Sequence, residues 1–162
     1  METGQEEYQS IHLSKAARIP YLIMRLALGG ALLEAGMDKL INGSFSAVGY
    51  LQNSTGPFAS LFSTLAGNAG VLDYLVVWGE ILIGIALVSG AFVRFASFWG
   101  AILMLLYYLP HLPPPNGWIS QQIIYLLVFI TLMFNGIGYF WGLDVFAKKL
   151  EEESHPLRIL FG

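Results

Sequence analysis

Long apolar stretches separated by short polar segments dominate the chain. They run over Ile19–Ile41, Val71–Val93, Phe95–Leu109 and Trp118–Trp141. A helix needs about 20 predominantly apolar residues to cross the hydrocarbon core of a bilayer. The pattern therefore predicts an all-α membrane protein built as a four-transmembrane-helix bundle.

Turn-forming residues mark the ends of the predicted spans. Asn42-Gly43-Ser44 is expected to end the first span, Ser89-Gly90 the second and Pro110 the third. Arg94 is expected in the tight turn before the third span. The one long connection, Phe45–Gly70, mixes aromatic residues with Gly, Ser, Thr and Asn. Because long structureless loops are uncommon, we expect this connection to form two short amphipathic helices at the membrane interface.

The composition indicates that lipid replaces water around much of the surface. Hydrophobic residues make up 56% of the 162 residues and charged residues only 12%, whereas soluble domains carry about 25% charged residues. The net charge of −3 and the lack of a basic cluster argue against nucleic-acid binding. Without cysteine, the chain itself offers no disulfide, thiolate nucleophile or cysteine-ligated iron–sulfur or zinc centre.

We expect three parts along the chain: an N-terminal arm over residues 1–17, a four-helix membrane domain over 18–144 and a C-terminal tail over 145–162. The first 17 residues lack the positive start and cleavage site of a secretory signal, so the first span is expected to be retained.

The distribution of basic residues predicts the orientation. Cytoplasmic loops carry an excess of Lys and Arg, and five basic residues fall on one side of the predicted bundle: Lys15, Arg18, Arg94, Lys148 and Lys149. The long connection and the proline-rich loop hold none. Both termini are therefore expected to be cytoplasmic, in a multi-pass protein of a prokaryotic plasma membrane.

Charged residues inside the spans are the first candidates for chemistry. A lipid-facing charge costs about 3 kcal/mol or more, so Arg25, Glu34 and Glu80 are expected to find partners inside the fold. Lys39 and Arg25 are the expected partners of Glu80. Two interpretations remain open: a structural ion pair, or a carboxyl group that relays protons. Glu80, Arg25 and Lys39 are accordingly the candidates for a catalytic role.

The first span has two distinct faces. At about 100° per residue, Arg25, Gly29, Gly36 and Lys39 share one side. The nearly opposite side carries an acidic, alanine-bearing set: Ala27, Ala31, Glu34, Ala35 and Asp38. Small residues let membrane helices approach closely, so both faces are predicted to be packing surfaces.

Aromatic residues around His111 are candidates for binding a quinone head group. His111 lies at the end of the third span beside Tyr107 and Tyr108, and Trp118 follows. We take His111, Tyr108 and Trp78 as the quinone candidates; the alternative is an interfacial aromatic belt. The other histidines, His12 and His155, lie outside the spans, so neither a bis-histidine haem nor a metal site is expected in this chain.

Several of these residues resemble the signature positions of DoxX/DoxD-like membrane proteins. Arg25 with Leu28-Gly29, followed by Gly36 and Lys39, resembles the R-x-x-x-G…G-x-x-K pattern of the first helix in that family. The stretch Glu80–Arg94 resembles its G-E-x-x-x-G-x-x-L-x-x-G-x-x-x-R pattern, and Asn135–Asp144 resembles its closing G-x-G-x-x-x-x-D segment. The resemblance covers about Arg18–Asp144 and implies a four-helix topology.

The resemblance implies two alternative functions. One is an integral membrane subunit of a quinone-linked redox complex, similar to thiosulfate:quinone oxidoreductase, working beside other subunits. The other is a non-catalytic accessory or scaffold subunit packed against a larger membrane enzyme, with a homo-oligomer also possible. Quinone is then the one cofactor expected. An anionic substrate is drawn by clustered cations, and here Lys39 is alone at the rim of the outer side, so a partner is expected to supply both charge and redox centre.

Overall fold

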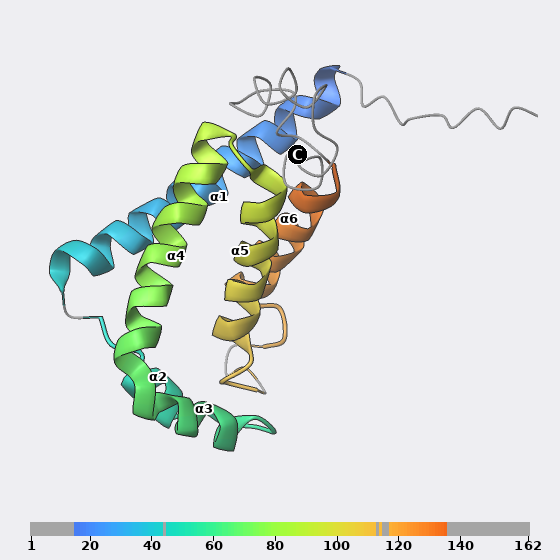
Figure 1. The fold of residues 1–162 in the computed structure, drawn as a ribbon. Helices are drawn as coiled ribbons and strands as arrows, with labels where there is room; N and C mark the ends of the chain where they lie inside the picture. The colour runs from blue at the N-terminus through green and yellow to red at the C-terminus, as the bar shows by residue number, and fades with distance from the viewer. Residues whose placement is uncertain (1–14, 44, 113, 115–116, 136–162) are drawn as a thin grey trace, which may run out of the picture.

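The computed structural model of the chain describes residues 15–43, 45–112, 114 and 117–135, and the regular elements within these ranges are helices (Figure 1). The long ones are α1 (Lys15–Asn42), α4 (Ala69–Ser89), α5 (Val93–Tyr108) and α6 (Gln121–Asn135). The short ones are α2 (Val48–Gln52), α3 (Ala59–Leu65) and the 3-10 helix η1 (Ala66–Asn68). The predicted all-α class and the two short helices before the second apolar helix are therefore confirmed.

The helix surfaces match a lipid environment. Arg18–Asn42 and Ala59–Ser89 are long and apolar enough to cross a membrane, while Val93–Tyr108 and Gln121–Asn135 are apolar but shorter. In each of the two long stretches, only 28% of an 18-residue apolar segment is buried inside the fold. The core helix of a soluble protein, by contrast, is mostly buried. Large apolar side chains such as Ile41, Leu75 and Phe134 face outward instead. This is the surface of a helical membrane protein.

The end of the second span is confirmed, whereas the position of Arg94 and the start of the fourth span need correction. α4 ends at Ser89, as the Ser89-Gly90 turn signal predicts, because Gly90 adopts a left-handed conformation with φ 70° and Phe92 follows with φ 53°. These two residues reverse the chain so sharply that Arg94, expected in the turn, lies in the first turn of α5. At the fourth span, α6 begins at Gln121 and not at Trp118. The remainder of the fourth apolar stretch lies outside the described residues.

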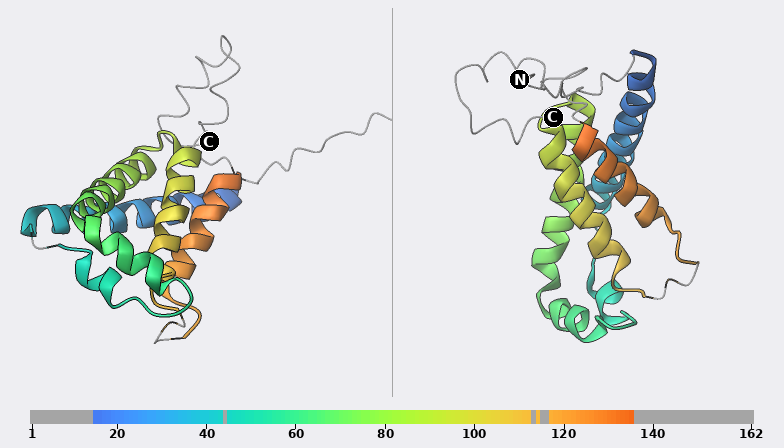
Figure 2. Two further views of the ribbon diagram at one scale, coloured as in Figure 1. Left: turned by 60° about the horizontal axis from the view of Figure 1, so that its bottom comes forward. Right: turned by 90° about the vertical axis from the view of Figure 1, so that its right-hand side faces the viewer.

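The long helices pack in two pairs, α1 against α4 and α5 against α6, with α4–α5 contacts joining the pairs. The start of α1, the α4–α5 turn and the described end of α6 lie at one end of the bundle, here called the terminal end. The opposite end, called the loop end, carries α2, α3 and the described residues between α5 and α6 (Figures 1 and 2). Arg18 and Arg94 both belong to elements that meet at the terminal end.

Glycines let α1 and α4 approach closely. A Cβ atom added to Gly84 of α4 would lie 2.8 Å from the backbone nitrogen of Leu33 and 2.9 Å from the carbonyl oxygen of Gly29, both on α1. At Gly36 it would lie 2.7 Å from Ile81 of α4. Absence of a side chain is thus what brings the two backbones together. The glycine-bearing side of the first span is a packing surface, as predicted.

The short helices α2 and α3 are fastened to the rest of the fold by packing and hydrogen bonds. They enclose a small cluster of their own: Ala47, Leu51, Phe62 and Ala66. The backbone N–H of Ala47 donates to Asp73 of α4 across 2.6 Å, and the Tyr50 hydroxyl donates to the carbonyl oxygen of Tyr107 at the end of α5. Partial burial raises the pKa of the Tyr50 phenol, so the group stays a protonated donor near neutral pH.

The close approach predicts that Gly84→Ala destabilises the protein by about 1–3 kcal/mol, because the added methyl group meets α1 backbone atoms that have no room to yield. Gly79→Ala is the matched control: it makes the same change on the same helix, where an added Cβ meets nothing within 4 Å. Unfolding of both variants in detergent micelles measures the difference. Equal stability of the two variants would contradict the packing described here.

Candidate functional site

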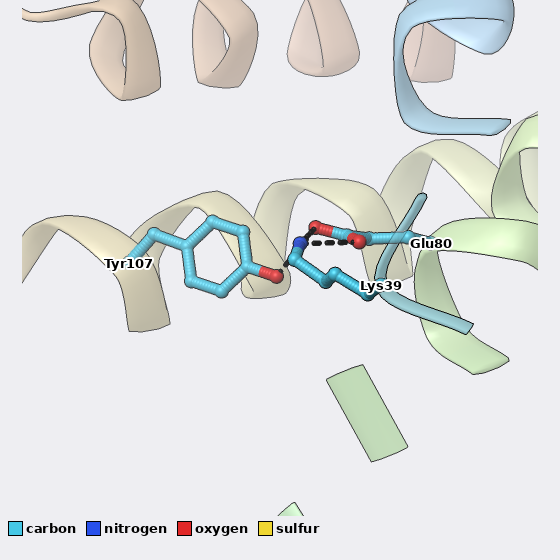
Figure 3. A network of polar contacts seen from close by, with 3 residues as sticks. All are labelled: Lys39, Glu80 and Tyr107. Atoms are coloured by element: carbon cyan, nitrogen blue, oxygen red, sulfur yellow. Dashed lines mark hydrogen bonds and ion pairs between the residues drawn. The ribbon is translucent and has the colours of Figure 1, made fainter. Parts of the chain in front are cut away.

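A buried carboxylate holds three helices together. Glu80 of α4 is only 2% exposed. Both of its carboxylate oxygens accept from Nζ of Lys39 on α1, each across 2.5 Å. The hydroxyl of Tyr107 on α5 donates to Oε1 of the same carboxylate across 2.6 Å. Figure 3 shows the three side chains converging from their separate helices.

The local sequence explains how the two charges meet. Gly36 lies one turn before Lys39 on the same side of α1, and a Cβ atom there would sit 3.1 Å from the Cβ atom of Glu80. Without that side chain, α1 settles against α4 directly beside Glu80. The lysine stem then spans the short remaining distance while its side chain keeps 21% of its surface exposed.

The ammonium group of Lys39 is also held by aromatic rings. Its Nζ lies 5.0 Å from the centroid of the Phe45 ring and 5.7 Å from that of Tyr107. Ring faces attract cations at such distances. Lys39 is therefore fully engaged, and the pair presents little net charge to its surroundings.

A cavity of about 180 Å³ borders the ion pair. It lies where α1, α4, α5 and α6 meet, and polar and apolar side chains share its wall. The lining residues are Ala31, Leu32, Ala35, Glu80, Met104, Tyr107, Gln121, Gln122 and Tyr125. The Nε2 amide of Gln121 donates to the Tyr125 hydroxyl across 2.9 Å. Carboxylate, phenol and amide groups together offer both donors and acceptors to a small ligand.

Of the three residues predicted to carry chemistry, the structure brings together Glu80 and Lys39. Arg25 is buried, with 3% of its surface exposed, but it does not reach Glu80. At about 1.5 Å of rise per residue, Arg25 lies about 21 Å along α1 from Lys39. The expectation that Arg25 also pairs with Glu80 is thus wrong, because helix rise separates the two in depth.

The acidic side of α1 differs from its prediction. Glu34 is exposed instead of paired inside the fold, and Asp38 is also exposed, accepting from the side-chain amide of Asn42 across 2.6 Å. The reason is angular: Glu34 lies about 200° around the helix from Gly36, which faces α4. Glu34 and Asp38 thus point away from α4, while Ala31 and Ala35 of the same face line the cavity that α1 shares with α6.

The quinone candidates from the sequence lie apart from the cavity. The ring of His111 lies against Tyr50, with 4.4 Å between ring centroids, and the Tyr108 hydroxyl donates to the carbonyl oxygen of Trp118 across 3.1 Å. Trp78 is 48% exposed on α4. None of the three candidates lines the cavity beside Glu80. Their role in quinone binding stays a prediction.

Sequence reasoning grouped Tyr107 with His111 but not with Glu80, and it missed the two glutamines. Tyr107 lies on the buried face of α5 with Gly100 and Met104, at spacings of one and two helical turns, and this periodicity was available as a signal. Gln121 and Gln122 are adjacent amides that open an otherwise apolar helix. Only the packing of α6 against α5 turns them toward Glu80.

Comparison with protein-family models matches residues 21–112 to the family described as DoxX, which is more than half of the 162 residues. The matched range contains Lys39, Glu80 and Tyr107. No solved structure matches the chain.

The buried pair predicts strong coupling between its members. Lys39→Met should destabilise the protein by about 3 kcal/mol, because it leaves the Glu80 carboxylate without its cation. The double variant Lys39→Met with Glu80→Gln should recover much of this loss, since no buried charge remains. Chemical unfolding in detergent micelles measures all variants.

Asp38→Asn is the control for these variants, because it removes an exposed charge one residue from Lys39. It should change the free energy of unfolding by no more than about 0.5 kcal/mol. Strictly additive losses in the double variant would show that Lys39 and Glu80 do not interact.

Proposed function

The chain belongs to the DoxX family, and from that membership we propose that it is an integral membrane subunit of a quinone-linked redox complex, similar to thiosulfate:quinone oxidoreductase. The observation that carries the proposal is the cavity beside Glu80. It joins a buried carboxylate, two phenols and two amides at a place that the membrane-facing helices α1 and α6 flank. A quinone needs such a site, because its carbonyl oxygens require hydrogen-bond donors and its ring requires an apolar surround.

The topology that accompanies this proposal has all four apolar helices crossing a prokaryotic plasma membrane, with both termini in the cytoplasm. The start of α1 and the described end of α6 lie at the same end of the bundle, as an even number of spans requires. Arg18 and Arg94 belong to that end, and basic residues favour the cytoplasmic side. The loop end then faces the outside.

In the proposed role, the polar groups of the cavity bind the quinone head and handle protons. Quinone reduction to quinol takes up two electrons and two protons. A partner subunit that oxidises a reduced sulfur compound supplies the electrons. Glu80 lines the cavity, is hydrogen-bonded by Tyr107, and is the group that relays both protons, one after the other, to the quinone oxygens. The protons come from water by way of Lys39, whose side chain is partly exposed.

The charges at the loop end argue that the sulfur chemistry takes place on the partner. Among the described residues near that end, Lys39 is the available cation, and it is engaged by Glu80. An anion such as thiosulfate is attracted by clustered, uncompensated cations. The chain therefore serves the quinone side of the reaction, and its partner serves the anionic substrate.

A second candidate function is a non-catalytic accessory subunit of a larger membrane enzyme. The exposed Glu34 favours it, because a carboxylate on a membrane helix is stabilised by a donor or cation from a neighbouring chain. Gly30, one turn before Glu34 on the same side of α1, has open space around it and permits a partner helix to approach closely. The same surface also suits a homo-oligomer.

Quinone binding tests the first function. Purified protein in quinone-free nanodiscs is expected to retain about one decylubiquinone per chain. Tyr107→Phe should weaken binding by about three- to tenfold, because the Glu80 carboxylate loses its phenol donor and then takes a hydrogen bond from the cavity amides that would otherwise donate to the quinone. One such hydrogen bond contributes about 0.5–1.5 kcal/mol. Retained quinone is measured by chromatography after gel filtration.

Tyr108→Phe is the matched control, since it removes the neighbouring hydroxyl, which bonds to the Trp118 carbonyl oxygen outside the cavity. Its affinity should equal that of the unaltered protein. Absence of saturable quinone binding in the unaltered protein would refute the redox function.

The accessory function predicts a different pattern. Glu34→Ala should release the chain from its native assembly, and Leu82→Ala, an exposed apolar change on α4, should not. Turnover per assembled complex should be the same with Tyr107→Phe as without it. Size-exclusion chromatography of gently extracted membranes, with quinone reduction assayed in each fraction, measures both quantities. A Glu34→Ala chain that stays assembled would contradict this function.

A further inference from the structure

A second cavity continues the first one along the bundle. It measures about 200 Å³ and lies between α1 and α6. Its lining is apolar apart from one phenol: Met24, Ala27, Leu28, Ile124, Tyr125 and Val128. Tyr125 lines both cavities, so they meet at this side chain. The two cavities together are called the α1–α6 groove below.

We infer that the α1–α6 groove binds one membrane amphiphile lengthwise, with an uncharged hydrogen-bonding head group beside Glu80 and an apolar tail between α1 and α6. The inference rests on the proposed quinone-linked function and assigns the quinone ring to the first cavity and its isoprenoid tail to the second. It therefore moves the quinone site away from His111, Tyr108 and Trp78, where the sequence placed it.

The groove is open sideways toward lipid. α1 and α6 contact each other far less than α1 contacts α4 or α5 contacts α6. Met24 and Ile124, one from each helix, line the second cavity while 42% and 51% of their surfaces remain exposed. A ligand dissolved in the bilayer can thus reach the groove without crossing water.

Polarity is graded along the groove. Hydrogen-bonding groups gather at the Glu80 cavity, and beyond Tyr125 the lining is aliphatic. Along α1 the lining runs from Ala35 back to Met24, which corresponds to about 16 Å of helix at the usual rise per residue. The head therefore lies toward the loop end and the tail points toward the terminal end.

The charges select a neutral head group. The Lys39 cation is already bound by both oxygens of Glu80, so no uncompensated cation among the described residues faces the cavity. Glu34 is exposed on α1 directly beside Ala35, which lines the cavity. An anionic phospholipid head would meet this negative charge without compensation. Gln121 and Gln122 can instead donate to carbonyl oxygens or accept from hydroxyl groups, which suits both quinone and quinol.

Photolabelling of the full chain tests the inference. Protein in quinone-free phosphatidylcholine nanodiscs is irradiated with a ubiquinone analogue whose decyl tail ends in a diazirine, and the labelled residues are identified by mass spectrometry. Labels are expected on Met24, Ile124 or Val128, and excess decylubiquinone should remove them. Ala27→Trp should reduce this labelling roughly tenfold, because the indole fills the apolar cavity.

Two further variants separate occlusion of the groove from misfolding. Ile85→Trp places the same indole on an exposed position of α4 and should leave labelling unchanged. Val128→Phe narrows the groove from α6 and should also lower labelling, with elution volume and melting temperature confirming that each variant is folded.

Three results would overturn the inference. If labels that excess decylubiquinone removes were confined to residues around His111 and Trp118, the groove would be refuted while the quinone-linked function would stand. If phosphatidylglycerol removed the labels as well as decylubiquinone does, the neutral head group would be refuted. Labelling that no quinone competes away, at any residue, would refute the groove and the proposed function together.

Discussion

The ion pair between Lys39 and Glu80 is the contact on which the arrangement of the helices depends. A carboxylate with 2% of its surface exposed is tolerated in an apolar bundle only when a cation and further donors neutralise it. Here the lysine comes from α1 and the Tyr107 hydroxyl from α5. One buried charge thus specifies how α1, α4 and α5 meet, since sliding any of them by a turn would leave the carboxylate without its partners.

Small residues make this arrangement possible and also leave room for a ligand. On the α4 side of α1, Gly29 and Gly36 bring the backbones into contact, and Gly84 completes the seam. On the other side, Ala31 and Ala35 are too short to fill the space toward α6, and the cavity remains there. Small side chains on α1 thus have two effects: they allow close packing on the face toward α4, and they leave an unfilled space on the face toward α6.

The same buried pair links stability to the proposed chemistry. Because it forms part of the cavity wall, Glu80 is both the group that the fold must neutralise and the most polar group that a bound ligand would meet. Polar groups inside a membrane bundle commonly mark functional pathways. The exposed Glu34 is the counterpart on the outer surface: a carboxylate that this chain leaves for lipid head groups, water or a partner to satisfy.

The sequence by itself determined the apolar helices, the short helices before α4, the glycine-bearing face of α1 and the pairing of Glu80 with Lys39, because apolar length, helical period and the cost of buried charge are local or pairwise properties. Only the tertiary structure decided that Arg25 lies too far along α1 to reach Glu80, that Glu34 faces outward, and that Tyr107 donates to the carboxylate while Gln121 and Gln122 line the cavity beside it. Those outcomes depend on how α1 and α6 are rotated and staggered against α4 and α5. Rotation and stagger come from the fit of many side chains at once, which no single stretch of sequence encodes.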